Sequence, residues 1–204
     1  MRIAISGLTG CGNSTASTLV SHSLKLKKFN YTFHNLAEDL GMPFDRLHEF
    51  AEKNPKYDYL LDKKQIEFAL KEKDCVVGTR LAVFLGEIAP RLKLKKPRFD
   101  LKVWLKAPLH VRAKRLAERD SRSFEQAVRE VVYRDDSNKK RYWALYKLHY
   151  DPPKGCLVID NEKLDALQTA KAIADAAEKL KRKMRKKKPK GRKGGKTKRT
   201  RAKR

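Results

Sequence analysis

The chain has 204 residues and a formal net charge of +26, so it is long enough for one hydrophobic core and basic enough to favour polyphosphate or nucleic-acid partners. No apolar run reaches the 18 or so residues of a membrane span and the N-terminus lacks a signal-peptide pattern, so we expect no membrane association and a cytoplasmic location. The three cysteines, Cys11, Cys75 and Cys156, are far apart and odd in number, which argues against a disulfide framework and a CxxC metal site.

Short apolar runs alternate along the chain with longer segments of helical spacing. The expected strands are 3–5, 31–33, 75–77, 101–105 and 156–159. The expected helices are 14–27, 43–53, 55–73, 108–119, 123–147 and a last one from 164 into the C-terminal tail. This order predicts an α/β fold of three layers, with a mostly parallel five-stranded sheet between helices, in one domain over residues 1–180.

Two helical regions interrupt this alternation. One lies between the second and third strands, and the other is a long basic pair at 108–150, before the last strand. Helical insertions in α/β nucleotide-binding proteins are common places for an acceptor site and a lid. We therefore expect an acceptor-binding insertion at about 34–73 and a lid at about 111–147.

The stretch GLTGCGNST, residues 7–15, follows the first expected strand and precedes the first expected helix. Its spacing is that of the phosphate-binding P-loop, G-x-x-x-x-G-K-[ST]. Such a turn directs backbone N–H groups and the positive end of the helix dipole into one concavity. The residues expected to hold nucleotide phosphates are Gly7, Leu8, Thr9, Gly10, Cys11, Gly12, Asn13, Ser14 and Thr15. The hydroxyl of Ser14 is the expected ligand for Mg²⁺.

Asn13 stands where the P-loop pattern has lysine. Its amide can donate a hydrogen bond to a phosphate oxygen but cannot neutralise the phosphate charge, so cationic groups must come from elsewhere in the fold. The competing interpretation is an ordinary strand-to-helix turn, in which glycines supply positive φ angles and residues 13–15 cap the helix.

Arginines at helical spacing on the lid can supply that charge. Arg112, Arg115 and Arg119 lie on one helix face, and Arg134 and Arg141 lie seven residues apart on the next helix. A mobile helical pair with forked guanidinium groups can close over polyphosphate and stabilise the charge that moves from donor to acceptor. The alternative is a solvated basic face whose arginines pair with acidic residues of the same helices, Glu118, Glu125, Asp135 and Asp136.

Three residues outside the loop and lid are candidates for the acceptor side. Arg80 follows the expected strand 75–77, and ligands of open α/β sheets lie beyond the carboxyl ends of strands. It is therefore expected to face the same crevice as the P-loop, unless it is a solvated residue at a helix start. Asp62 and Gln65 lie at i and i+3 of a helix in the first insertion, where they can read a base or hold a metal-bound water, or simply lie on the surface.

The C-terminal tail has a composition of its own. Residues 181–204 hold 16 of the 50 lysines and arginines, three glycines and no acidic residue. Such a segment can bury almost nothing apolar, so we expect it to be disordered. It has no aromatic residue to stack on bases, which predicts salt-dependent binding of RNA or ribosomes without sequence specificity. The alternative is a tail that only adds solubility.

Six stretches occur in order along residues 1–162: ISGLTGCGNST, AEDLGMPFDRLHEFAEKNPKYDYLLDKKQ, VVGTRLA, LKVWLKAPLHVRAKRLAERD, RDDSNKKRYWALY and LVID. Together they resemble the archaeal type of cytidylate kinase, a nucleoside monophosphate kinase of the P-loop class. The first loop in members of that family resembles G-x-P-G-x-G-T-T-T, so a P-loop without lysine is typical of the family.

The resemblance implies transfer of the terminal phosphate of ATP to CMP, with Mg²⁺, to give CDP and ADP, and dCMP is expected as a further acceptor. Carried over by motif, residues 7–15 would hold the ATP phosphates and Arg80 would lie in the acceptor region. Phosphoryl transfer needs in-line positioning and charge neutralisation more than a protein base. The lid residues that grip both phosphate groups would be Arg115, Arg119, Arg134 and Arg141.

Two features depart from the family pattern. After the second strand the family resembles SAG-x-x-F-R, whose arginine reaches the acceptor phosphate, whereas here His34 takes the arginine position and Asn30 the glycine position. A neutral imidazole can hydrogen-bond the phosphate but loses the bidentate charged pair. The basic tail is the other departure. Both keep a second function open, that of a P-loop ATPase or a non-enzymatic nucleotide-binding factor associated with RNA or ribosomes.

Overall fold

The strands form one parallel sheet. The computed structural model describes residues 1–187, apart from the side chains at 48, 52 and 187. Its strands pair in parallel in the order β2-β3-β1-β4-β5, which confirms the expected sheet. Their bounds are β1 (Arg2–Gly7), β2 (Lys27–Lys28), β3 (Cys75–Gly78), β4 (Leu101–Lys106) and β5 (Leu157–Asp160).

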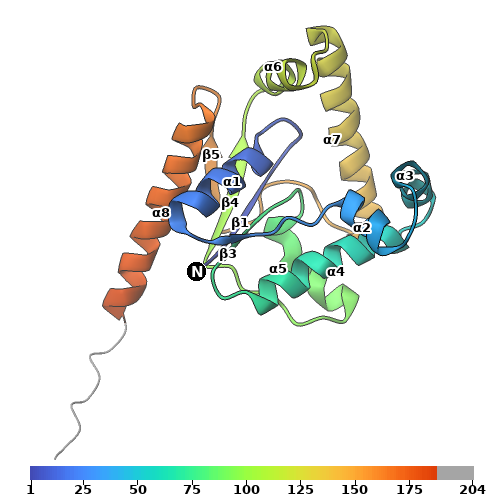
Figure 1. Ribbon diagram of the computed structural model, residues 1–204. Coiled ribbons are helices and arrows are strands. Elements are labelled where there is room, and N and C mark those ends of the chain that lie inside the picture. The colour runs from blue at the N-terminus through green and yellow to red at the C-terminus, as the bar shows by residue number, and fades with distance from the viewer. Residues whose placement is uncertain (188–204) are drawn as a thin grey trace, which may run out of the picture.

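Each face of the sheet has its own hydrophobic core, because successive side chains of a strand point to opposite faces. Ile3 and Ile5 of β1 belong to the core shared with α1 (Asn13–Leu24) and α8 (Ala166–Lys187). Ala4, between them, belongs to the core shared with α4 (Lys56–Lys71) and α5 (Leu85–Ile88). Figure 1 shows these helix pairs on opposite sides of the sheet, so the three-layer expectation is confirmed.

Both expected insertions are helical. The first contains α2 (Phe33–Asp39), α3 (Phe44–Lys53) and α4, and the second contains α6 (Leu109–Asp120) and α7 (Phe124–Tyr146). In Figure 1, α6 lies beyond the end of β4, and α7 runs back from α6 toward α2. Two 3-10 turns that the sequence pattern did not indicate, η1 (Ala82–Phe84) and η2 (Ala89–Leu92), flank α5.

The expected strand at 31–33 is wrong. The second strand is the short β2, and Phe33 already begins α2. Asn35 accepts a hydrogen bond from the backbone N–H of Thr32 over 2.9 Å in a capping box that starts this helix. Local capping therefore outweighs the β propensity of residues 31–33. The first helix also ends early, at Leu24, because Lys25 adopts a left-handed conformation with φ of 53°.

Helix α8 continues into the expected tail. It ends at Lys187, so residues 181–187 are helical rather than disordered. Packing of Ala170, Ile173 and Ala177 fixes the helix in the core, and lysine and arginine, as good helix formers, prolong it. The rest of the expected tail, residues 188–204, lies outside the described residues. In the described part of the chain, no helix has the length and apolar character needed to cross a membrane.

Candidate active site

Two glycines shape the loop between β1 and α1. Gly10 and Gly12 have φ angles of +81° and +89°, in the left-handed region that favours glycine. A Cβ on Gly10 would lie 2.7 Å from the carbonyl oxygen of Arg112, so the loop lies in direct contact with the start of α6. The backbone path of the loop therefore requires glycine at both positions.

The loop presents a set of free hydrogen-bond donors. Within the described residues, the loop N–H groups that donate to no protein acceptor include those of Gly10, Gly12, Asn13, Ser14 and Thr15. Three of them belong to the first turn of α1, where the helix dipole adds positive charge. The hydroxyl oxygen of Thr9 is buried and also lacks a partner. A polyphosphate supplies the acceptors that these donors need, so the loop fits ATP.

The side chain of Asn13 closes the loop. Its Nδ2 donates to the carbonyl oxygen of Gly7 over 2.9 Å, and the hydroxyl of Tyr150 donates to the same oxygen over 3.0 Å. The Nδ2 of this amide is therefore bound within the loop, whereas its Oδ1 is buried without a partner. The positive charge that lysine gives to other P-loops has to come from elsewhere in the fold.

The chain offers few ligands for a metal ion. Among the described residues, no three His, Cys, Asp or Glu side chains gather closely enough to hold one. Ser14 is exposed on the loop, and its hydroxyl fits as one ligand of a Mg²⁺ ion that arrives with the phosphates of ATP.

One cavity of about 1110 Å³ joins the loop, the lid and the first insertion. A pocket for a single small ligand usually measures roughly 300–1,000 Å³, so this cavity has room for a donor and an acceptor. Most of the expected site residues line it. They are residues 8–15 of the loop, Asp62, Arg80, Arg115, Arg119, Arg134 and Arg141.

Two expected site residues lie outside this lining. A Cβ on Gly7 would lie 2.5 Å from the carbonyl oxygen of Leu105, so Gly7 serves the close approach of β1 and β4. His34 is exposed on α2 and stacks on Phe44, with ring centroids 3.7 Å apart. The structure thus places His34 away from the acceptor position expected for it, because α2 begins at Phe33 and turns the imidazole toward α3.

Two lid arginines have weakly held partners. Arg119 binds the adjacent Asp120 at 2.6 Å with its side chain 63% exposed, and Arg134 binds Glu130 one turn earlier at 2.6 Å. The hydrogen bond from Arg119 lowers the pKa of Asp120. Ion pairs of this kind at a protein surface contribute only about 0–1 kcal/mol to stability. Both guanidinium groups can therefore exchange their partners for phosphate at small cost.

The other two lid arginines are held by distant elements. Arg115 donates to the carbonyl oxygen of Asn161 over 2.7 Å, which fixes the loop between β5 and α8 against the lid. Arg141 binds Asp58 of α4 at 2.5 Å and donates to the carbonyl oxygen of Ala51 over 2.7 Å. Burial raises the pKa of Asp58 in spite of this pairing. Arg141 thus joins the lid to the first insertion.

Asp62 belongs to a buried hydrogen-bond network. Its carboxylate accepts from the Tyr146 hydroxyl over 2.6 Å and from Nε2 of Gln65 over 2.8 Å, and Oε1 of Gln65 accepts from the Thr79 hydroxyl. Burial raises the pKa of Asp62 to about 7, although the hydrogen bond from Tyr146 opposes this shift. Asp62 and Gln65 are only 4% and 3% exposed, so neither is a surface residue.

Arg80 lines the cavity two residues beyond the end of β3. Its side chain is exposed there, beside the buried hydroxyl of Tyr142. Burial raises the pKa of Tyr142 to about 12, against the lowering effect of the Arg80 charge. A cation thus lies at the carboxyl edge of the sheet, as the sequence order predicts.

Asn161 was not identified from the sequence as a residue near the site, and Arg112, expected with the other lid arginines to supply charge to the phosphates, does not line the cavity. Asn161 is 3% exposed, donates to the carbonyl oxygen of Cys11 over 2.9 Å and accepts from Arg115, so it joins the P-loop to the lid. Arg112 and Asp135 are 7% and 6% exposed and pair across the two lid helices, rather than lying on a solvated face. Only the place of Asn161 after a strand end could have signalled it.

Two of the solved structures that resemble this fold are kinases. A shikimate kinase from Bacteroides thetaiotaomicron aligns with a TM-score of 0.56 and 15% identity, over 89% of this chain and 98% of that chain. A deoxyadenosine kinase from M. mycoides aligns with a TM-score of 0.51 and 18% identity, over 88% and 100%. These likenesses concern the fold alone. With the strand-loop-helix anion site and the arginine-bearing lid, the fold defines the class of P-loop kinases.

The sequence places the chain within this class. The model of the cytidylate kinase-like family matches residues 2–163. Cytidylate kinase 2 from Borrelia garinii subsp. bavariensis is 31% identical over 184 residues, which cover 88% of this chain and 97% of that protein. A cytidylate kinase from Archaeoglobus fulgidus is 34% identical over 181 residues, or 87% and 95%. The chain therefore belongs to the cytidylate kinase-like family.

Proposed function

We propose that the protein transfers the terminal phosphate of ATP to CMP, giving ADP and CDP, in the cytoplasm. One observation carries this proposal: a single cavity holds a loop of free backbone donors, a buried carboxyl group and the four lid arginines. Family membership and relatives named cytidylate kinase support the same reaction.

The donor half of the site is the P-loop. Its free N–H groups bind the phosphate oxygens of ATP, and Ser14 supplies a hydroxyl ligand to Mg²⁺. When bound, Mg²⁺ neutralises part of the charge on the phosphates. Because Asn13 is committed to Gly7, the rest of the charge neutralisation comes from the lid.

The acceptor half reads a pyrimidine through Asp62. Each of its oxygens has one protein partner and keeps a further lone pair, and the residue lines the cavity. Cytosine presents an exocyclic amino donor where uracil presents an oxygen acceptor, so an ionised carboxylate favours cytosine. Arg80 supplies a guanidinium group for the acceptor phosphate. We include dCMP as a further acceptor.

Arginines stabilise the charge on the phosphoryl group during transfer. Arg119 and Arg134 line the cavity, and their acidic partners belong to the same helices, so phosphate can replace these partners. Arg115 and Arg141 act from positions fixed by other elements. In-line positioning and these charges suffice without a protein base.

The deciding experiment is coupled ATP consumption by the full-length protein, with CMP, dCMP, UMP, AMP and GMP offered separately beside a blank without acceptor. We expect saturable consumption with CMP, a preference over UMP, and CDP as product. Acceptor-independent hydrolysis would instead favour a P-loop ATPase. ATP binding without any turnover would favour a nucleotide-binding factor.

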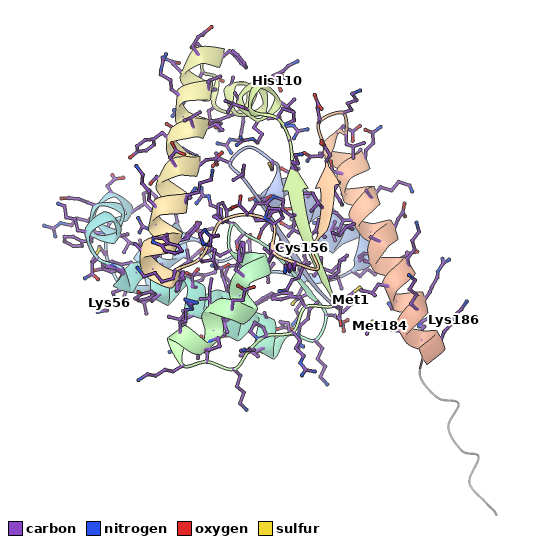
Figure 2. All side chains as sticks on the ribbon, turned by 180° about the vertical axis from the view of Figure 1, so that it is seen from behind. Met1, Lys56, His110, Cys156, Met184 and Lys186 are labelled. Atoms are coloured by element: carbon purple, nitrogen blue, oxygen red, sulfur yellow. The ribbon has the colours of Figure 1, made fainter. Side chains whose placement is uncertain are left out.

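We propose a second function for residues 181–204, whose described part is the end of α8: we expect them to bind RNA or ribosomes without sequence specificity. Glu178 is the last acidic residue of this helix. After it, exposed basic residues accumulate among the described residues, namely Lys179, Lys181, Arg182, Lys183, Arg185 and Lys186. Figure 2 shows Met184 and Lys186 at the opposite end of the molecule from His110 of the lid, so an RNA bound there leaves the cavity open. The energy of such binding comes from neutralised phosphates.

Truncation after Leu180 tests this second function. Among the described side chains of α8, Ala177 is the last buried one, so the truncated chain keeps its core. We expect RNA affinity at 0.1 M salt to fall by at least about tenfold, with a flatter salt dependence, because the neutralised phosphates are lost. CMP kinetics should not change. Equal RNA affinity in the truncated protein would contradict the assignment.

A further inference from the structure

One residue of the P-loop, Thr9, has both its backbone N–H and its backbone carbonyl oxygen bound by the lid. The backbone N–H of Thr9 donates to Oδ1 of Asp135 over 2.9 Å, and the carbonyl oxygen of Thr9 accepts from Nη1 of Arg112 over 2.9 Å. Asp135 belongs to α7 and Arg112 to α6. Both backbone hydrogen-bonding groups of Thr9 are therefore occupied, one by a side chain of α6 and the other by a side chain of α7.

The two side chains also bind each other. Nη1 of Arg112 lies 2.5 Å from Oδ2 of Asp135, and Nε of Arg112 donates to the carbonyl oxygen of Ala107, between β4 and α6, over 3.1 Å. Arg112, Asp135 and Thr9 are 7%, 6% and 9% exposed, so water does not compete for these bonds. Gly10 packs directly on Arg112, and a Cβ at this position would clash with the backbone of Arg112. The result is a closed polar network at the base of the lid.

This network determines which backbone N–H groups of the loop remain available to a ligand. The N–H of Thr9 points to Asp135 and away from any ligand, whereas the N–H groups from Gly10 to Thr15 that lack protein partners remain for phosphate. If the carboxylate of Asp135 were absent, the peptide of Thr9 would be free to turn. The arrangement of the remaining donors would then no longer be fixed before ATP binds, which lowers affinity through the cost of ordering the loop.

We propose that Arg112 and Asp135 are positioning residues, which hold the P-loop in its ATP-binding shape. They also fix the base of the lid, from which the other lid arginines reach the phosphates. The proposal rests on the proposed function in naming ATP as the ligand. A buried ion pair is weak evidence for stability, since apolar residues of similar size often stabilise as well or better. Stability alone therefore does not explain why this ion pair is buried here, whereas a role in holding the P-loop does.

The first test compares Asp135→Ala with Asp136→Ala in the full-length protein. Asp136 is the next residue of the same helix and is exposed, so its substitution is a matched control. For Asp135→Ala we expect the KM for ATP to rise by about ten- to hundredfold, the range for losing a charge-assisted hydrogen bond, with the KM for CMP within about twofold. An unchanged KM for ATP, or equal rises in both KM values, would overturn the proposal.

The second test separates positioning from folding. Asp135→Ala leaves the charge of Arg112 buried without its partner, so a double variant, Arg112→Met with Asp135→Leu, removes both charges. We expect its Tm to exceed that of Asp135→Ala, because no charge is left buried without a partner, while the KM for ATP stays raised. Recovery of the wild-type KM in this variant would show a merely structural role and overturn the proposal.

A binding measurement keeps this inference distinct from the proposed reaction. The Kd of a non-hydrolysable ATP analogue with Mg²⁺, measured by calorimetry, should rise in both variants relative to the wild type and Asp136→Ala. This result is expected whether or not CMP is the acceptor, so a wild type inactive on CMP would refute the reaction and leave the positioning role supported. Equal Kd values in all four proteins would overturn the positioning role.

Discussion

The lid and the end of α8 are both rich in basic residues, yet their charges have different surroundings. In the lid, Arg112, Arg115 and Arg141 each bind groups on other elements of the fold. Along α8, the ion pairs of the described residues join Lys171 to Asp175 and Arg182 to Glu178, within the helix itself. These three lid charges therefore have fixed positions, whereas the charges at the end of α8 act only through their number.

That difference predicts two kinds of mutational behaviour. Where tertiary contacts fix a charge next to a reacting group, a single substitution removes a specific interaction and has a large effect. Where charge acts only through its amount, each residue contributes a small and nearly additive share. The following variants sharpen this contrast or break it.

Arg119→Ala should have the largest effect. We expect kcat for CMP phosphorylation to fall by about one to three orders of magnitude, the range for losing one transition-state charge contact. Arg129→Ala is the matched control, since Arg129 is exposed on α7 and does not line the cavity. Steady-state kinetics at saturating ATP and CMP provide the measurement, and equal kcat values in the two variants would remove Arg119 from the site.

Arg141→Ala should combine a kinetic effect with a loss of stability. It is expected to lower kcat by about one to three orders of magnitude as well. The substitution also removes the ion-pair partner of the Asp58 carboxylate, which is largely buried, so Tm should fall. Adding Asp58→Asn should restore Tm but not kcat, as followed by thermal unfolding and steady-state kinetics. If kcat returned together with Tm, Arg141 would have only a structural part.

Asp62→Asn should change how stability depends on pH. Burial raises the pKa of Asp62 to about 7, whereas in the unfolded chain it is about 3.9, so the folded state binds the proton more tightly. The contribution of the protonated carboxyl to stability is present at acid pH and is lost as the pH rises through 7.

The neutral amide that Asp62→Asn introduces avoids that loss. We therefore expect the Tm of this variant, relative to wild type, to rise by several degrees between pH 5 and pH 8, at about 2–4 °C per kcal/mol. Thermal unfolding across this range measures it, with the exposed Asp45→Asn as control. A Tm difference that does not vary with pH would show that Asp62 keeps an ordinary pKa.

Lys183→Ala should have the smallest effect. Lys183 is exposed near the end of α8 with no acidic residue after Glu178. Removing one phosphate contact should lower RNA affinity by only a few-fold at 0.1 M salt and reduce the salt slope by about 0.7–0.9. kcat should not change. Filter binding at several salt concentrations measures this, and a loss as large as that of the whole truncation would indicate a specific site instead.

Much of the fold could be predicted because it depends on local patterns. Apolar runs and helical spacing indicated four of the five strands and the helices of both insertions. The second strand was misplaced because the capping of α2 by Thr32 and Asn35 outweighs β propensity at residues 31–33. The P-loop was predictable for the same local reason, since its glycines and the first turn of α1 are contiguous in sequence.

The sequence by itself determined the α/β class, the P-loop, the two helical insertions and the set of arginines available to the lid, because spacing and order along the chain are sufficient for each. Only the tertiary structure decided which charges act together. It separated Arg112, buried against Asp135 and Thr9, from Arg119, which lies two turns further along the same helix yet is exposed. It also turned His34 away from the cavity. Burial and partners between distant elements set the energy of a charge, and these exist only once the chain is packed.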